Sequence, residues 1–210
     1  ADGTTLLGAD DKAGVAEILA AMEYLVKHPE IRRPRIRVGI TPDEEIGRGA
    51  SKFNIAAFNA DCAYTLDGGW LGEVNSETFS ADGASIKFTG VAVHPGFAKN
   101  RMVNAIKYAA KFVERLPADE RPENTEGRQG FYHMTDIGGN ASEAVVSLIL
   151  RDFEVDKLKA RGECVKKIAA GLMAEEPRLK VTVEISETYR NMAYWLKDKP
   201  EITEKLVKAV

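Results

Sequence analysis

Residues 84–116, ASIKFTGVAVHPGFAKNRMVNAIKYAAKFVERL, decide the fold of the larger part of this chain. Residues 84–93 predict a strand. Residues 101–116 carry apolar side chains at the spacing of one helical face, which predicts an amphipathic helix. The apolar positions of that face are Met102, Ala105, Ile106, Ala109, Phe112, Val113 and Leu116.

The segments after this helix extend the pattern into an α+β unit. A polar stretch, PADERPENTEGRQG at residues 117–130, predicts a loop. Four more elements are predicted beyond it: strands at 131–137, 143–153 and 179–188, and a helix at 156–173. The resulting order β-α-β-β-α-β is that of a ferredoxin-like fold.

The segments before residue 84 predict a different architecture. Residues 1–7 are expected to end a strand or hairpin, and a helix is expected to begin near Asp11. Further elements are expected at residues 35–40 (strand), 41–49 (polar loop), 51–58 (short helix) and 62–66 (short apolar strand). Such alternation of strands and helices is typical of an α/β domain with a largely parallel sheet.

Composition excludes several classes of partner. The 210 residues carry a net charge of only −3, so no broad basic surface invites nucleic acid. No apolar stretch reaches the roughly 18 residues of a membrane span, and the first residues lack a signal-peptide pattern. Cys62 and Cys164 fit no metal-binding spacing; one disulfide is possible, but two buried thiols in a reducing compartment are favoured. We therefore expect no membrane partner and a cytoplasmic location.

Carboxylates follow three of the expected elements at one edge of the first sheet. Asp10 lies in LLGADDKAG, Glu44 and Glu45 lie in TPDEEIG, and Asp67 lies in YTLDGG. Ligands of α/β sheets bind outside the carboxyl ends of the strands. Because clustered carboxylates repel one another, a divalent cation such as zinc is the expected remedy. Each feature also has a simpler interpretation, as a helix cap, a solvated acidic pair and a turn, respectively.

These motifs, in this order and spacing, resemble a dinuclear zinc metallopeptidase family that includes carboxypeptidase G and succinyl-diaminopimelate desuccinylase. Within it, TPDEEIG, TEGRQGFYHM, LILRDF and VHPGFAKNRMVNA resemble the peptidase T group of tripeptide aminopeptidases, and the likeness covers nearly the whole chain. The resemblance implies a partial α/β catalytic domain at residues 1–77, an inserted ferredoxin-like lid at 78–190 and a return segment at 191–210.

The resemblance also implies roles for the carboxylates. Asp10 would bridge two zinc ions, Glu45 would bind one of them, and Asp67 would bind the other. Glu44 would be the general base that takes a proton from the attacking water and passes it to the leaving amine. The implied reaction is hydrolysis of the N-terminal peptide bond of a short peptide.

Four residues of the expected ferredoxin-like unit are candidates on weaker grounds. His94 in VHPG would help stabilise the oxyanion, often across a dimer interface in related enzymes; its alternative is a surface or capping residue. Arg151 in LILRDF would bind the terminal carboxylate of the peptide, or would be an ordinary arginine at a strand end. Asn104 is a further candidate for substrate binding, and His133 is weaker; both also have structural interpretations.

The sequence departs from the family at two metal ligands. The family uses a histidine in an upstream His-x-Asp motif and another near the carboxyl end, and neither falls within these residues; His28 in YLVKHPE does not substitute. We therefore expect an internal fragment whose two-zinc site is incomplete. Three functions stay open: a tripeptide aminopeptidase, a related deacylase or carboxypeptidase, and a non-catalytic module that forms a homodimer through the lid.

Overall fold

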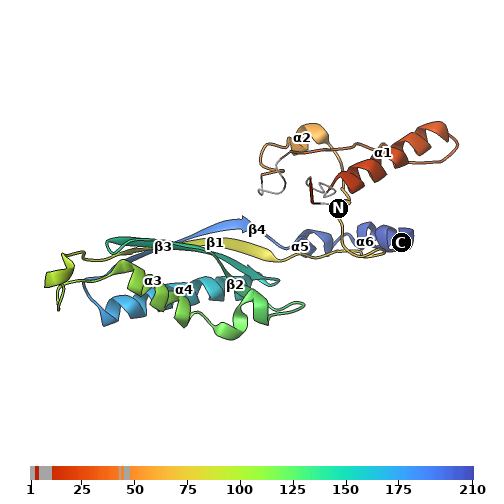
Figure 1. Cartoon of the computed structure of the whole chain (residues 1–210). Coiled ribbons are helices and arrows are strands. Elements are labelled where there is room, and N and C mark those ends of the chain that lie inside the picture. Colours follow the sequence, from red (N-terminus) through yellow and green to blue (C-terminus); the bar gives the residue numbers. More distant parts are fainter. Residues whose placement is uncertain (1–2, 5–10, 43, 45–47) are drawn as a thin grey trace. The chain divides into compact units, whose positions relative to one another are not determined.

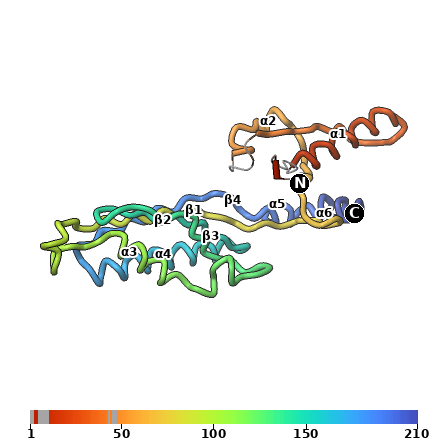
Figure 2. The backbone as a smooth tube through the Cα atoms, viewed as in Figure 1, coloured from red at the N-terminus to blue at the C-terminus, as the bar shows by residue number. Residues whose placement is uncertain are grey.

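The computed structural model describes residues 3–4, 11–42, 44 and 48–210 of the chain (Figures 1 and 2). These residues form two compact units, one of residues 1–74 with 205–210 and one of residues 75–204. The assignment of these parts as catalytic domain, lid and return segment stays a prediction.

The unit of residues 75–204 is a four-stranded antiparallel sheet with two helices. Its strand order is β2-β3-β1-β4, which together with the chain order is the ferredoxin-like arrangement. Figure 1 shows both helices on the same face of this sheet. The elements are β1 (Ser80–Thr89), α3 (Ala105–Arg115), β2 (Phe131–Gly139), β3 (Glu143–Asp152), α4 (Val155–Glu175) and β4 (Lys180–Tyr189). The predicted α+β plan is confirmed.

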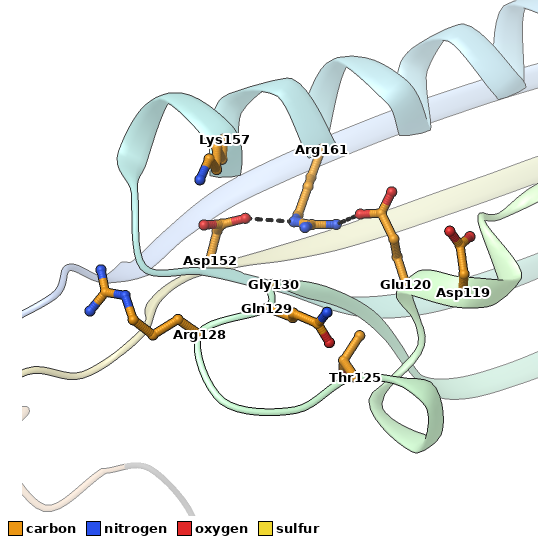
Figure 3. A pocket seen from close by; sticks show the side chains of 9 residues that line it. All are labelled: Asp119, Glu120, Thr125, Arg128, Gln129, Gly130, Asp152, Lys157 and Arg161. Carbon is orange, nitrogen blue, oxygen red and sulfur yellow. Dashed lines mark hydrogen bonds and ion pairs between the residues drawn. The ribbon is translucent and has the colours of Figure 1, made fainter.

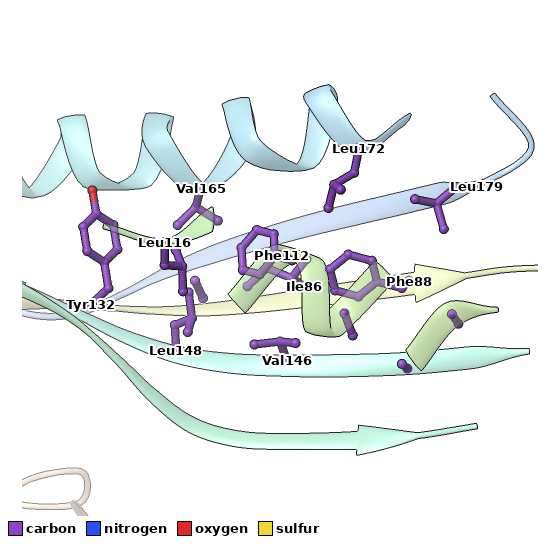
Figure 4. Close-up of a cluster of buried hydrophobic side chains, with 14 of the residues drawn as sticks. Ile86, Phe88, Phe112, Leu116, Tyr132, Val146, Leu148, Val165, Leu172 and Leu179 are labelled. Atoms are coloured by element: carbon purple, nitrogen blue, oxygen red, sulfur yellow. The ribbon is translucent and has the colours of Figure 1, made fainter. Parts of the chain in front are cut away.

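The core lies between the sheet and these helices because the strands alternate. Even-numbered residues of β1 and β3 are buried beneath the helices, while most odd-numbered ones are partly or fully exposed. Phe88 of β1 and Phe112 of α3 are both fully buried and meet edge to face, with ring centroids 5.6 Å apart (Figure 4). The opposite face, with Arg151 and the other odd-numbered residues of β3, carries neither α3 nor α4.

Short elements complete this unit. Three are 3₁₀ turns, η2 (Pro95–Phe97), η3 (Ala118–Glu120) and η4 (Pro122–Asn124), and α5 (Ala193–Leu196) follows β4. The last helix, α6 (Pro200–Ala209), begins in this unit, and its last residues belong to the other unit.

The other unit contains α1 (Lys12–Lys27) and α2 (Ile55–Phe58). Asp11 caps α1 because its carboxylate accepts the backbone N–H of Gly14 at 2.9 Å. The strands expected at 35–40 and 62–66 are not present among the described residues. A strand forms only when a neighbouring strand pairs with its backbone N–H and C=O groups, and an alternating sequence pattern does not supply that neighbour. In agreement, the apolar side chain of Ile40 is 63% exposed.

Two expectations from composition can be compared with the structure. Cys62 and Cys164 are both free; Cys62 is exposed and Cys164 is half-buried, so the expectation that both thiols are buried is wrong. The reason is that residues 62–66 form no buried strand. Among the described helices, none is both long enough and apolar enough to cross a membrane.

Candidate functional site

The loop of Asp67 lies against the start of α1. Gly14, in the first turn of α1, is buried, and a Cβ placed on it would lie 2.5 Å from the carbonyl oxygen of Leu66. Only glycine admits this approach, because a contact below 3.0 Å would force the backbone apart. The motifs GADDKAG and TLDGG therefore meet in space, and the exposed Asp67 follows directly after the contact.

Glu44 belongs to the same unit. A Cβ on Gly49 would lie 3.0 Å from the Thr41 hydroxyl oxygen and 3.3 Å from the Glu44 Cα, so Gly49 lies close to both Thr41 and Glu44. The Glu44 side chain is exposed to solvent. A carboxylate in this setting is accessible to a water molecule and to a substrate.

The predicted metal ligands are only partly within the described chain. Asp10 and Glu45 lie outside the described residues, while Asp67 lies within them. Across the part of the chain that is described, no group of three or more histidine, cysteine, aspartate or glutamate side chains is placed to hold a metal. Three carboxylates still suit a hard or borderline divalent cation, and the Gly14–Leu66 contact places the Asp67 loop at the helix that Asp10 precedes.

His94 caps the short turn η2. Its Nδ1 accepts the backbone N–H of Gly96 at 3.1 Å, and its ring lies 5.6 Å from the ring of Phe97. The neutral imidazole therefore carries its proton on Nε2. Since His94 is exposed, this Nε2–H is available as a hydrogen-bond donor to an external oxygen.

Asn104 has a structural role in this unit. It is the N-cap of α3, and its side-chain oxygen accepts the backbone N–H of Lys107 at 3.4 Å. Its role in substrate binding stays a prediction. His133 is exposed on β2, directly opposite Ile149 of β3.

We expect Asn104→Ala to lower the free energy of unfolding by about 1 kcal/mol, because α3 loses a capping acceptor. Urea unfolding of the chain, followed by circular dichroism, measures the change. The exposed Lys107→Ala serves as a control and should shift stability by less than about 0.5 kcal/mol. If Asn104→Ala leaves stability unchanged but weakens peptide binding, Asn104 binds substrate and its capping bond contributes little to stability.

Among the residues that the structure describes, the Arg151 side chain forms no ion pair and donates no hydrogen bond. Its Cζ instead lies 5.8 Å from the ring centroid of Phe79 and 5.9 Å from that of Phe131. Both distances are within the range of a cation–π interaction. An unpaired guanidinium held in this way is suited to bind a carboxylate from outside.

The next residue, Asp152, belongs to a buried ionic cluster that sequence reasoning did not find. Arg161 of α4 donates from Nε to Asp152 at 3.1 Å and from Nη1 to Glu120 of η3 (Figure 3). The side chains of Arg161 and Asp152 are 11% and 3% exposed. Burial has the largest single effect and lowers the pKa of Arg161, but the hydrogen bonds and charges of Glu120, Tyr132 and Asp152 together outweigh it and raise the pKa above its usual value.

The cluster explains part of the motif TEGRQGFYHM. A Cβ on Gly130 would lie 2.3 Å from a carboxylate oxygen of Asp152 and 2.5 Å from the carbonyl oxygen of Arg151, so this position requires glycine. The glycine in the motif was the available sequence signal. Nine residues border the adjoining polar cavity of about 430 Å³, among them Arg128, Gln129 and Lys157.

Comparisons with known proteins agree with this layout. A family model described as "Peptidase dimerisation domain" matches residues 76–179, and one described as "M42 glutamyl aminopeptidase" matches residues 7–114. Solved structures of a tripeptidase from Staphylococcus aureus and of an aminopeptidase from Bacillus cereus have TM-scores of 0.76 and 0.73. Each is 26% identical and covers 90% of this chain and 51% of the other chain.

Curated relatives are more similar in sequence. Peptidase T of Bacillus licheniformis is 52% identical over 209 residues, which cover 100% of this chain and 51% of the relative. Peptidase T of Shouchella clausii is 50% identical with the same coverage, and that of Streptococcus pneumoniae is 54% identical over 91% of the chain and 47% of the relative. The chain thus spans about half the length of the curated relatives it matches. With this identity along its entire length, the chain belongs to the peptidase T family.

Proposed function

We propose that the full-length enzyme containing this chain hydrolyses the N-terminal peptide bond of tripeptides. The observation that carries the proposal is the contact of Gly14 with Leu66, which joins two of the carboxylate motifs, in a chain half identical to peptidase T. The name of the Staphylococcus aureus neighbour, a tripeptidase, supports the same substrate length.

We infer that Asp10, Glu45 and Asp67 contribute to a site for two zinc ions, with Asp10 as the shared ligand. The site would be completed by histidines from outside this chain. When bound, such metal ions lower the pKa of a water molecule and polarise a carbonyl group. The all-carboxylate donor set of these residues fits cations of this kind.

The side chains of this chain handle the protons and the charge. Glu44, in its exposed loop, accepts a proton from the attacking water and returns it to the leaving amine. His94 offers its Nε2–H to the oxygen of the tetrahedral intermediate, because its Nδ1 is occupied by the N–H of Gly96. Arg151 binds the terminal carboxylate of the peptide with its guanidinium, which has no ion-pair partner among the described residues.

Oligomer and location are also part of the proposal. The dimerisation-domain match at residues 76–179 supports a homodimer formed through this unit. The two free thiols, Cys62 and Cys164, support a cytoplasmic location, since reducing compartments keep cysteines unpaired.

A substrate panel tests the function in the full-length enzyme. The panel holds trialanine, dialanine, N-acetyltrialanine and an N-acyl amino acid, each with and without a metal chelator. We expect release of the N-terminal residue from trialanine, loss of cleavage on acetylation, and loss of activity with chelator. Preferred cleavage of the N-acyl amino acid would identify a deacylase, and release of the C-terminal residue would identify a carboxypeptidase; either result would overturn the proposal.

A further inference from the structure

Three phenylalanines gather beside Arg151 at the end of β3. The rings of Phe79 and Phe131 are 5.4 Å apart, and those of Phe79 and Phe153 are 4.3 Å apart. All three side chains are half-buried. They come from the segment before β1, from the start of β2 and from the turn after β3, so segments distant in the sequence meet in this cluster.

The register of the sheet places this aromatic cluster on one face. Arg151 pairs with Phe131 on one side and with Ala81 on the other. Directly opposed residues point to the same face, and residues two positions apart do so as well. Ala81, Arg151 and Phe131 therefore share the face opposite the helices, and the Phe79 ring lies beside Arg151 and Phe131 through its direct contacts with them.

Two arginines contact this cluster, but only one of them is neutralised. The Cζ of Arg128 lies 4.5 Å from the ring centroid of Phe153, and its Nη1 donates to the carboxylate of Glu77. Arg151 lies on Phe79 and Phe131 and has no acidic partner among the described residues. The guanidinium of Arg128 is therefore ion-paired, whereas the guanidinium of Arg151 has no ion-pair partner among the described residues.

Burial of the Arg151 side chain limits which of its nitrogen atoms an external group can reach. The Nε of Arg151 is buried and without a hydrogen-bond partner, and it is the one such buried side-chain atom among the described residues. Its two Nη atoms also donate to no described residue, and they are not fully buried. The Nη edge is the part of Arg151 that an external group can reach.

We propose that Phe79 and Phe131 are positioning residues that seat the Arg151 guanidinium and keep its Nη donors free for the carboxylate of the peptide. A carboxylate partner within the protein would orient Arg151 equally well, but it would occupy the donors that the substrate needs. An aromatic face attracts the cation without using an N–H donor. The inference rests on the proposed function of Arg151.

The test compares trialanine with trialanine amide in the full-length enzyme. The ratio of the two kcat/KM values reports recognition of the free carboxylate. We expect Arg151→Met to lower this ratio at least tenfold, because a charge-assisted hydrogen bond is lost. Phe131→Leu and Phe79→Leu should each lower it about fivefold, through a higher KM for trialanine, while kcat/KM for the amide stays within about twofold. Phe131→Tyr, which keeps the ring face, should retain the ratio.

Arg128→Met is the matched control, because it removes a guanidinium from the same cluster whose charge is already paired. It should leave the ratio unchanged. If the Leu variants lower kcat/KM equally for the acid and the amide, the rings have only a structural role and the inference is wrong. If Arg151→Met leaves the ratio unchanged, the carboxylate role of Arg151 fails. If Arg151→Met lowers the ratio and the Leu variants do not, Arg151 binds the carboxylate but Phe79 and Phe131 do not position it.

A binding measurement separates the inference from turnover. In a Glu44→Gln background, calorimetry gives the Kd of trialanine and of its amide without hydrolysis. The Leu variants should weaken binding of the acid about fivefold and leave binding of the amide unchanged. Equal weakening for both ligands would contradict the inference, and the unfolding midpoint of each variant shows whether it is folded.

Discussion

Replacing Glu44 with glutamine in the full-length enzyme should lower kcat by about 10²- to 10⁴-fold, the usual contribution of a positioned general base. Glutamine keeps the size of the side chain but cannot accept the proton of the attacking water at neutral pH. Because Glu44 is not among the proposed metal ligands, metal content should stay near the wild-type value. Steady-state kinetics on trialanine and metal analysis of the purified variant measure the two effects.

Glu23→Gln is the control for this substitution. Glu23 is exposed on α1, where it pairs with Lys27, so its loss should leave kcat unchanged. A Glu44→Gln enzyme with more than about a tenth of the wild-type rate would contradict the assignment, since that loss corresponds to under about 1.4 kcal/mol of barrier.

Replacing Arg161 with methionine should lower the free energy of unfolding by about 3–5 kcal/mol, because the carboxylate of Asp152 remains buried without its counter-charge. Asp152 is 3% exposed, and its carboxylate also accepts the backbone N–H of Glu154 at 3.2 Å. Chemical denaturation of the chain of 210 residues, followed by circular dichroism, measures the loss.

Arg115→Met is the matched control on the neighbouring helix. Arg115 pairs with Glu175 at the surface, with side chains 37% and 44% exposed, so its loss should cost no more than about 1 kcal/mol. The double variant Arg161→Met/Asp152→Asn should recover part of the stability, because no uncompensated charge stays buried. If Arg161→Met and Arg115→Met lower the free energy of unfolding equally, the burial of the Arg161–Asp152 pair does not determine how much that pair stabilises the fold.

Sequence periodicity was sufficient for the unit of residues 75–204. The spacing of Phe112 and its neighbours predicted a helix at 101–116, and the observed α3 begins later, at Ala105, because Asn104 caps it. Each strand of this unit finds its partner within the same unit, so local pattern and final pairing agree. The first unit differs, because residues 35–40 carry a strand pattern without a paired strand among the described residues.

For the candidate site, the sequence by itself determined which chemical groups are available. TPDEEIG and TLDGG supply carboxylates, VHPG supplies a histidine and LILRDF supplies an arginine, and their roles as metal ligands, base, hydrogen-bond donor and anion site stay predictions. The tertiary structure alone decided which side chains surround them. Phe79 and Phe131 reach Arg151 through antiparallel pairing, and Arg161 reaches Asp152 when α4 packs on the sheet. Such contacts depend on register and packing between distant segments, which no local period encodes.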